Sequence, residues 1–172
     1  MKWQAFLWKI QKKHIRETQG SAAIEFAFLF PVFFLTFMAV FELGAIMFVQ
    51  TTLERAVLNV ARFGRTGDEV PSQTREDTAQ ALIKAATLNY LFLDPAKLVL
   101  TVTSYDNFAD IPTSSTAPST GVKDFGSSRK PVLYTLNYPW NFWTPLLGQF
   151  LSNTPSSTIY LTATSIIQNE PF

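Results

Sequence analysis

The fold is decided by residues 16–44, which read RETQGSAAIEFAFLFPVFFLTFMAVFELG. Residues 26–41 of this stretch carry no charge, and as a helix rising about 1.5 Å per residue they span roughly 24 Å. Continuing past Glu42 to Leu53 gives ample length for a hydrocarbon core of about 30 Å. The run therefore predicts a membrane-spanning helix. An ordinary cleaved secretory signal is disfavoured, because it would be shorter and would end in small residues of the A-x-A type.

Charge is distributed unevenly around this run. Only Glu17 opposes the basic residues that precede it, which are Lys2, Lys9, Lys12, Lys13 and Arg16. Positive residues flanking a span tend to stay in the cytoplasm, so we expect a cytoplasmic amino end and a chain that lies outside the cytoplasm from about Thr51 onward. The net charge of the 172-residue chain is only +1 and gives no indication of nucleic-acid binding.

Two carboxylates interrupt the apolar run. Glu25 lies just inside its start, where a charge is costly enough to need a reason. Glu42 lies some 32 Å beyond Ser21 along a helix, so we expect it at the outer interface, with pairing between helices as the alternative. The two carboxylates are about 100° out of phase and do not form one polar stripe.

Helical periodicity continues beyond the span. Small or apolar residues occupy the helical stripe at positions 53, 56, 57, 60, 61 and 64. Gly64, Gly67 and Pro71 are expected to end this helix. A second helix is expected from about Ser72 to Leu91, with Ser72 or Thr74 as its N-cap.

Three later stretches, residues 98–105, 132–140 and 157–167, alternate between apolar and polar residues, as strands with one buried face do. Pro139 lacks an N–H, so Tyr138 and Trp140 are expected near or past the end of the second strand. The sequence predicts an α+β fold in which a long N-terminal transmembrane helix continues into a small head, with a helix packed on an antiparallel sheet.

The sequence offers no catalytic set. Cysteine is absent and His14 is the only histidine, which removes the usual ligands and bases of zinc sites, thiol catalysis and Ser-His relays. Two carboxylate pairs, Asp68 with Glu69 and Asp106 with Asp110, lie in turn-like sequence where acids make local hydrogen bonds. We therefore predict no catalytic, cofactor-binding or metal-binding residues and no enzymatic activity.

An aromatic cluster follows the second expected strand. Trp140, Phe142 and Trp143 have no basic residue near them in the sequence, which disfavours a stacking platform for nucleic acid. Two interpretations stay open for this cluster: packing in the core, and contact with a partner or the membrane surface.

The start of the apolar run resembles a class III signal of the type IV pilin kind. A short basic leader ends at Gly20, and a cut between Gly20 and Ser21 would make Glu25 the fifth residue of the new chain. An uncleaved anchor is the alternative. The longer stretch GSAAIEFAFLFPVFFLTFMAVFELGAIMFVQTTLERAVLNVARFGRTG is similar to the N-terminal region of TadE-like minor pseudopilins of tight-adherence (Tad/Flp-type) pilus systems. The shared features are a G-x-x-x-x-E-F start, an early proline, an E-x-G and a closing A-R-x-G. The ending IYLTATSIIQNEPF also resembles the family, although Gln168 stands where a basic residue is expected.

This resemblance implies a leader (1–20) removed by a prepilin peptidase, a transmembrane helix (21–52) and a periplasmic pilin-like head (53–172). The protein would be held in the inner membrane and would join or prime a pilus with other pilins and pseudopilins. Glu25 would pair with the new ammonium group at Ser21, in the same chain or a neighbouring subunit. The alternative is an uncleaved, signal-anchored periplasmic binding or sensory domain with its site between Trp140 and Phe150.

Overall fold

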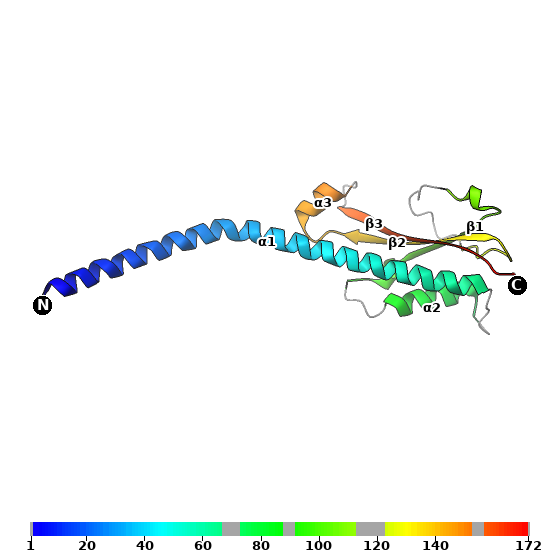
Figure 1. Cartoon of the computed structure of the whole chain (residues 1–172), viewed down its shortest axis with the longest axis horizontal. Helices are drawn as coiled ribbons and strands as arrows, with labels where there is room; N and C mark the ends of the chain where they lie inside the picture. The colour runs from blue at the N-terminus through cyan, green and yellow to red at the C-terminus, as the bar shows by residue number, and fades with distance from the viewer. Residues whose placement is uncertain (1, 67–72, 88–91, 113–122, 153–156, 172) are drawn as a thin grey trace. The chain divides into compact units, whose positions relative to one another are not determined.

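The computed structural model describes residues 2–66, 73–87, 92–112, 123–152 and 157–171, with side chains from Gly20 onward except at 145–146. In chain order the elements are α1 (Lys2–Thr66), α2 (Arg75–Thr87), the 3-10 helix η1 (Pro95–Lys97), β1 (Val99–Ser104), the 3-10 helix η2 (Phe108–Asp110), β2 (Pro131–Asn141), α3 (Pro145–Leu151) and β3 (Thr158–Gln168) (Figure 1). A long apolar helix followed by a small helix and a three-stranded antiparallel sheet confirms the predicted α+β class.

The chain forms two compact units, Met1–Phe41 and Glu42–Phe172, which we call the anchor unit and the head unit. The anchor unit is the first part of α1. Its large apolar side chains are exposed, from 39% at Leu35 to 78% at Phe28. Water would disfavour such a surface, whereas lipid tails would not. From Gly20 onward, α1 is long and apolar enough to cross a membrane, which is compatible with a single-pass membrane anchor.

In the head unit, the rest of α1 and α2 pack on the sheet. The predicted stripe is confirmed, since Leu53, Ala56, Val57, Val60 and Ala61 are all buried in the core. The stripe also extends one to two turns toward the N-terminus. The buried residues in that direction are Ala45 and Val49.

The head unit of the structure begins at Glu42, and the limits expected for the membrane span (21–52) and for the periplasmic head (53–172) stay predictions. The apolar residues from Ser21 to Phe41 still form about 31 Å of helix, enough for a hydrocarbon core of about 30 Å.

The sheet is a meander with the order β1-β2-β3, and both strand pairs are antiparallel. The core face of β2 carries the alternating residues predicted from the sequence, Val132, Tyr134, Leu136, Tyr138 and Trp140. Side chains of β1 and β3 join the same core. They are Leu100, Val102, Leu161 and Ala163.

Tyr138 and Trp140 lie within the second strand, close to its end, and not past it. β2 runs through Pro139 to Asn141, and the proline pairs with Tyr160 of β3. The carbonyl of Pro131 faces β1, where it accepts from Tyr105 N at 2.9 Å, and backbone groups alternate sides along a strand. The missing N–H of Pro139 therefore faces the β1 side. Pairing with β1 has already ended at Asn137, so no ladder bond is lost.

The helix ends follow the local sequence. α1 ends at Thr66, as the following glycine predicts. Thr74 caps α2: its hydroxyl accepts from Asp77 N at 3.1 Å, while its own N–H donates to the Asp77 carboxylate at 3.4 Å. The alternative N-cap, Ser72, lies outside the described residues, as does the expected end of this helix at Leu91.

Helix α3 was not expected from the sequence. It follows β2 almost directly, with Thr144 as the N-cap and Pro145 at the first helical position, where a fixed φ and a missing N–H cost nothing. Two helical turns are too short to show an apolar period. The turn chemistry of Thr144-Pro145 was the available signal.

Candidate functional site

A buried carboxylate organises the start of the head unit. Glu42 is completely buried and accepts three hydrogen bonds from the segment that leads into α3. Its Oε1 accepts from Trp143 N at 2.5 Å and from Trp140 Nε1 at 3.3 Å, and its Oε2 accepts from Thr144 N at 2.8 Å. The carboxylate therefore joins α1 to the junction between β2 and α3.

The chemistry of this junction suits an anion. The first N–H groups of a helix have no partner within the helix, and the helix dipole is positive there. Thr144 makes no side-chain capping bond of its own, so the carboxylate of Glu42 takes the capping role from another element. Sequence reasoning missed this contact. The available signal was that Glu42 lies on the same helical stripe as Ala45, Val49 and Leu53.

The structure separates the three aromatic residues predicted as a contact site. Trp140 is 2% exposed and belongs to the core, and Phe142 is partly buried against it. The Trp143 side chain is 47% exposed, with its ring 5.0 Å from Trp140 and 5.5 Å from Phe92, measured between centroids. Trp140 therefore packs in the core. For Trp143, contact of its exposed part with a partner or the membrane stays a prediction.

The predicted processing and pairing residues lie on exposed helix in the anchor unit. Gly20, Ser21 and Glu25 are all exposed, and the Ser21 hydroxyl donates to Glu25 Oε1 at 3.3 Å. This spacing of one helical turn is short enough for a charge pair, if cleavage converts the Ser21 nitrogen into an ammonium group. Both the cut and the pair stay predictions.

The N-E-P stretch closes the head unit against the end of α1. Asn169 is buried, and its Nδ2 donates to the carbonyls of Phe125 at 2.9 Å and Ser127 at 3.1 Å. The next residue, Glu170, donates its N–H to Arg65 O at 3.0 Å and pairs with the Arg65 guanidinium at 2.9 Å. The backbone bond satisfies a carbonyl that the end of α1 leaves unpaired.

Gln168 lies where the resemblance led us to expect a basic residue. Its Nε2 donates to Arg129 O at 2.9 Å, so this side chain makes an amide contact with the turn before β2.

The glycine of the A-R-x-G motif has a steric role. A Cβ on Gly64 would lie 1.9 Å from the hydroxyl oxygen of Tyr134, closer than any side-chain atom can approach. Tyr134 is fully buried on β2, and burial raises the pKa of its hydroxyl to about 12. Gly64 therefore lets α1 pass directly over the central ring of the core.

The acidic residues considered for catalysis have structural partners. Asp106 pairs with Lys130 at 2.9 Å, and Asp110 accepts from Asn107 N at 3.2 Å in a capping box. Asp68 and Glu69 lie outside the described residues. Across the part of the chain that the structure describes, no group of three or more His, Cys, Asp or Glu side chains could hold a metal ion.

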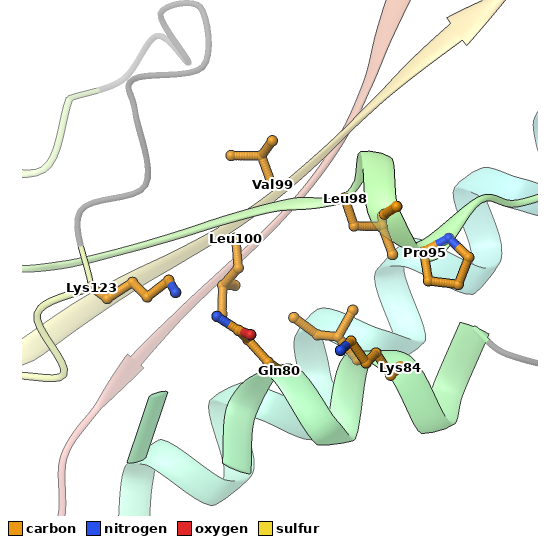
Figure 2. A pocket seen from close by; sticks show the side chains of 9 residues that line it. Gln80, Lys84, Pro95, Leu98, Val99, Leu100 and Lys123 are labelled. Atoms are coloured by element: carbon orange, nitrogen blue, oxygen red, sulfur yellow. The ribbon is translucent and has the colours of Figure 1, made fainter. Parts of the chain in front are cut away.

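A pocket of about 430 Å³ lies between α2, η1 and β1 (Figure 2). It is lined mainly by apolar groups, together with Gln80, Lys84 and Lys123, and Lys123 also forms an ion pair with Glu76. The lining residues include no carboxylate, histidine or hydroxyl that could act as base or nucleophile. The pocket also contains no residue of 140–150, the segment in which the binding-domain alternative places its site.

Comparison with known families gives one match. A family model described as TadE-like protein matches residues 20–62, which confirms the resemblance predicted from the sequence over that segment. The chain matched no curated protein and no solved structure. The matched segment runs from the predicted cleavage site through the apolar helix and Glu42 into the core stripe of the head unit.

Proposed function

Because residues 20–62 match the TadE-like family and thereby connect the chain with Tad pilus systems, we propose that it is a minor pseudopilin of such a pilus. In this proposal a prepilin peptidase cuts between Gly20 and Ser21. The remaining helix holds the protein in the inner membrane, with the head unit in the periplasm. The single observation that carries the proposal is that the family match begins at Gly20, the residue at which a class III signal would be cut.

The exposed surface of the anchor unit supports this function. Apart from Met38 and Ala39, which are half-buried, its apolar side chains from Ile24 to Phe41 are exposed, and the stretch contains no charge after Glu25. Such a helix suits two apolar environments in turn. It can lie among lipid tails as an anchor and later pack among similar helices in a filament. The head unit, by contrast, already buries the apolar stripe of its own part of α1.

Glu25 has a defined role in this proposal. Cleavage creates an ammonium group at Ser21, one turn from the Glu25 carboxylate. An unpaired charge in an apolar bundle costs several kcal/mol, so pairing within the chain or with a neighbouring subunit favours the axial register in which the two charges meet. The other pilins and pseudopilins of the system are therefore the expected partners of this end of the protein.

The experiment that tests the proposal is to determine the N-terminus of the protein from cells with and without an active prepilin peptidase. We expect the mass of a chain beginning at Ser21 only in cells with the peptidase. Gly20→Asp should block the cut and leave membrane insertion intact. Full-length protein in both strains would refute the proposal and favour an uncleaved anchored domain.

Topology is tested independently with a reporter fused after Phe172. Activity of a reporter that works only in the periplasm is expected, because the basic residues before Gly20 hold the amino end in the cytoplasm. Activity of a cytoplasmic reporter at the same position would contradict the orientation.

A further inference from the structure

Three large apolar side chains at the start and end of α3 stay exposed after the core of the head unit is assembled. They are Trp143, Phe150 and Leu151. Phe150 is 82% exposed and Leu151 is 49% exposed. Unlike the apolar residues of the anchor unit, these lie in a segment that the family match does not include. We call the three residues the α3 patch.

The α3 patch is held in place rather than loosely attached. Glu42 binds the backbone N–H groups of Trp143 and Thr144. On the other side of the helix, Gly148 packs so closely on Ser157 that an added Cβ would lie 2.7 Å from the serine Cβ. The exposed position of Phe150 is therefore set by contacts on the inner side of α3.

The segment that carries the patch has no charge of its own. Residues 131–169, which include β2, α3 and β3, contain no Asp, Glu, Lys or Arg. The carboxylate of Glu42, which binds the backbone of Trp143 and Thr144, is fully buried and adds no charge to the exposed surface. The patch is also small. Three side chains fall well short of the roughly 800 Å² that each partner buries in a typical stable protein interface.

The position of the patch along the chain identifies its environment. Glu42 directly follows Phe41, and exposed apolar residues continue along α1 at Leu43, Met47 and Phe48. The helix from Ser21 to Phe41 is already about 31 Å long, enough for a hydrocarbon core of about 30 Å, so in a membrane-anchored protein the residues that bind Glu42 lie near the boundary of that core. Tryptophan is enriched at this level of a bilayer. Helix α3 is only about 10 Å long, so its far end lies within reach of the interfacial layer as well.

We propose that the α3 patch inserts into the outer interfacial layer of the bilayer that α1 spans, as a second contact between the head unit and the lipid. The proposal rests on the proposed membrane anchorage by α1. Phe150 and Leu151 enter the acyl boundary, while Trp143 lies at the headgroup level. The contact fixes the head unit against the membrane surface and must be broken before the protein can leave the bilayer.

The absence of cysteine in the chain allows a direct test with nitroxide labels on single introduced cysteines in the full-length protein. The test site is Phe150→Cys. The matched control is Phe108→Cys, an equally aromatic, 56% exposed site in η2 beyond the opposite end of the sheet. Phe33→Cys, 70% exposed in the anchor unit, reports anchorage. Each protein is reconstituted in phosphatidylcholine and phosphatidylglycerol vesicles, and collision rates with oxygen and with a water-soluble nickel chelate are measured.

We expect labels at Phe150 and Phe33 to collide more with oxygen than with nickel, and the label at Phe108 to show the reverse. A label at Phe150 that behaves like the one at Phe108, while Phe33 reports lipid, would overturn the α3 contact and leave the anchorage intact. A nickel-accessible label at Phe33 would overturn both. The label at Phe150 could also be shielded from both reagents and show spin broadening that disappears when unlabelled protein is added. That result would assign the patch to contact between copies of the chain and refute lipid insertion. A label at Leu151→Cys should repeat the result for Phe150.

Discussion

Removing the carboxylate of Glu42 should destabilise the head unit. In Glu42→Ala the buried indole of Trp140 and the N–H groups of Trp143 and Thr144 all lose their acceptor. The two short backbone bonds to a charged group contribute about 1.5–3 kcal/mol each, and the longer indole bond contributes less. The cost of burying the carboxylate itself offsets part of this sum. The net loss should be roughly 2–4 kcal/mol, or about 10 °C in melting temperature for a unit of this size.

Glu42→Gln removes the charge of the side chain and keeps its size and shape. Its amide oxygen can still accept one or two of the N–H groups, but the amide nitrogen would face a donor. We expect about half the loss seen for Glu42→Ala. The matched control is Glu54→Gln on the same helix, where the carboxylate is exposed and accepts from Gln50 Nε2 at 3.3 Å, and where a change below about 0.5 kcal/mol is expected.

The assay is thermal unfolding of the full-length protein in nanodiscs, followed by near-ultraviolet circular dichroism. Above about 290 nm, where tryptophan dominates, this signal reports the tilted ring pair of Trp140 and Trp143, provided that Trp3 and Trp8 are replaced by phenylalanine. If both Glu42 variants unfold within about 2 °C of the parent protein, or no further from it than the Glu54 control, the bonds to Glu42 contribute too little for the role described here.

Three further changes test other parts of the molecule. Gly64→Ala should lower the melting temperature because the added Cβ forces the ring of Tyr134 to move, and adding Tyr134→Phe should recover part of that loss. Gly44→Ala is the control, because nothing lies within 4 Å of the Cβ it adds, and it should be neutral or stabilising; equal effects at the two glycines would contradict the steric argument. Hydrogen bonds from Ser104 and Gly126 hold the pKa of Asp124 below its usual 3.8, so the stability that its carboxylate contributes is present above pH 3.8 and is lost as the pH falls through the lowered pKa. The acid-induced fall in melting temperature should therefore be smaller in Asp124→Asn, and a pH profile identical to that of the parent protein would contradict this contribution. Glu25→Gln should be inserted and cut normally yet fail to support pilus assembly, and normal piliation would show that the charge is dispensable.

The sequence predicted the elements whose pattern is local. The stripe from Leu53 to Gly64 and the alternation in β2 were both visible, because each residue's burial follows from the period of its own helix or strand. Strand order was not predictable, because the residue pattern of β1 or β3 does not specify which strand lies beside it in the sheet. The effect of Pro139 was not predictable, because a proline is tolerated at this position of β2 only where pairing with β1 has already ended.

The candidate site was predictable only in part. The TadE-like segment, including Gly20 and Glu25, follows a short linear pattern that one sequence can show. The role of Glu42 depends on donors about a hundred positions away along the chain, and a sequence pattern gives the face on which a residue lies but not the group that meets it. The exposure of Phe150 likewise depends on how α3 is seated, and α3 is too short to show an apolar period.

The bonds between Glu170 and Arg65 also have a consequence for the order of events during synthesis. The end of α1 leaves the ribosome early, but the carbonyl of Arg65 can accept from Glu170 only when residue 170 has been made. The two ends of the head unit cannot meet until the residues between them have been made, so the head unit stays open during synthesis. A nascent chain in this state exposes the free edge of β2 and the core stripe to chaperones and proteases. Completion of β3 covers that edge of β2, and Glu170 then joins the end of the chain's last strand to α1.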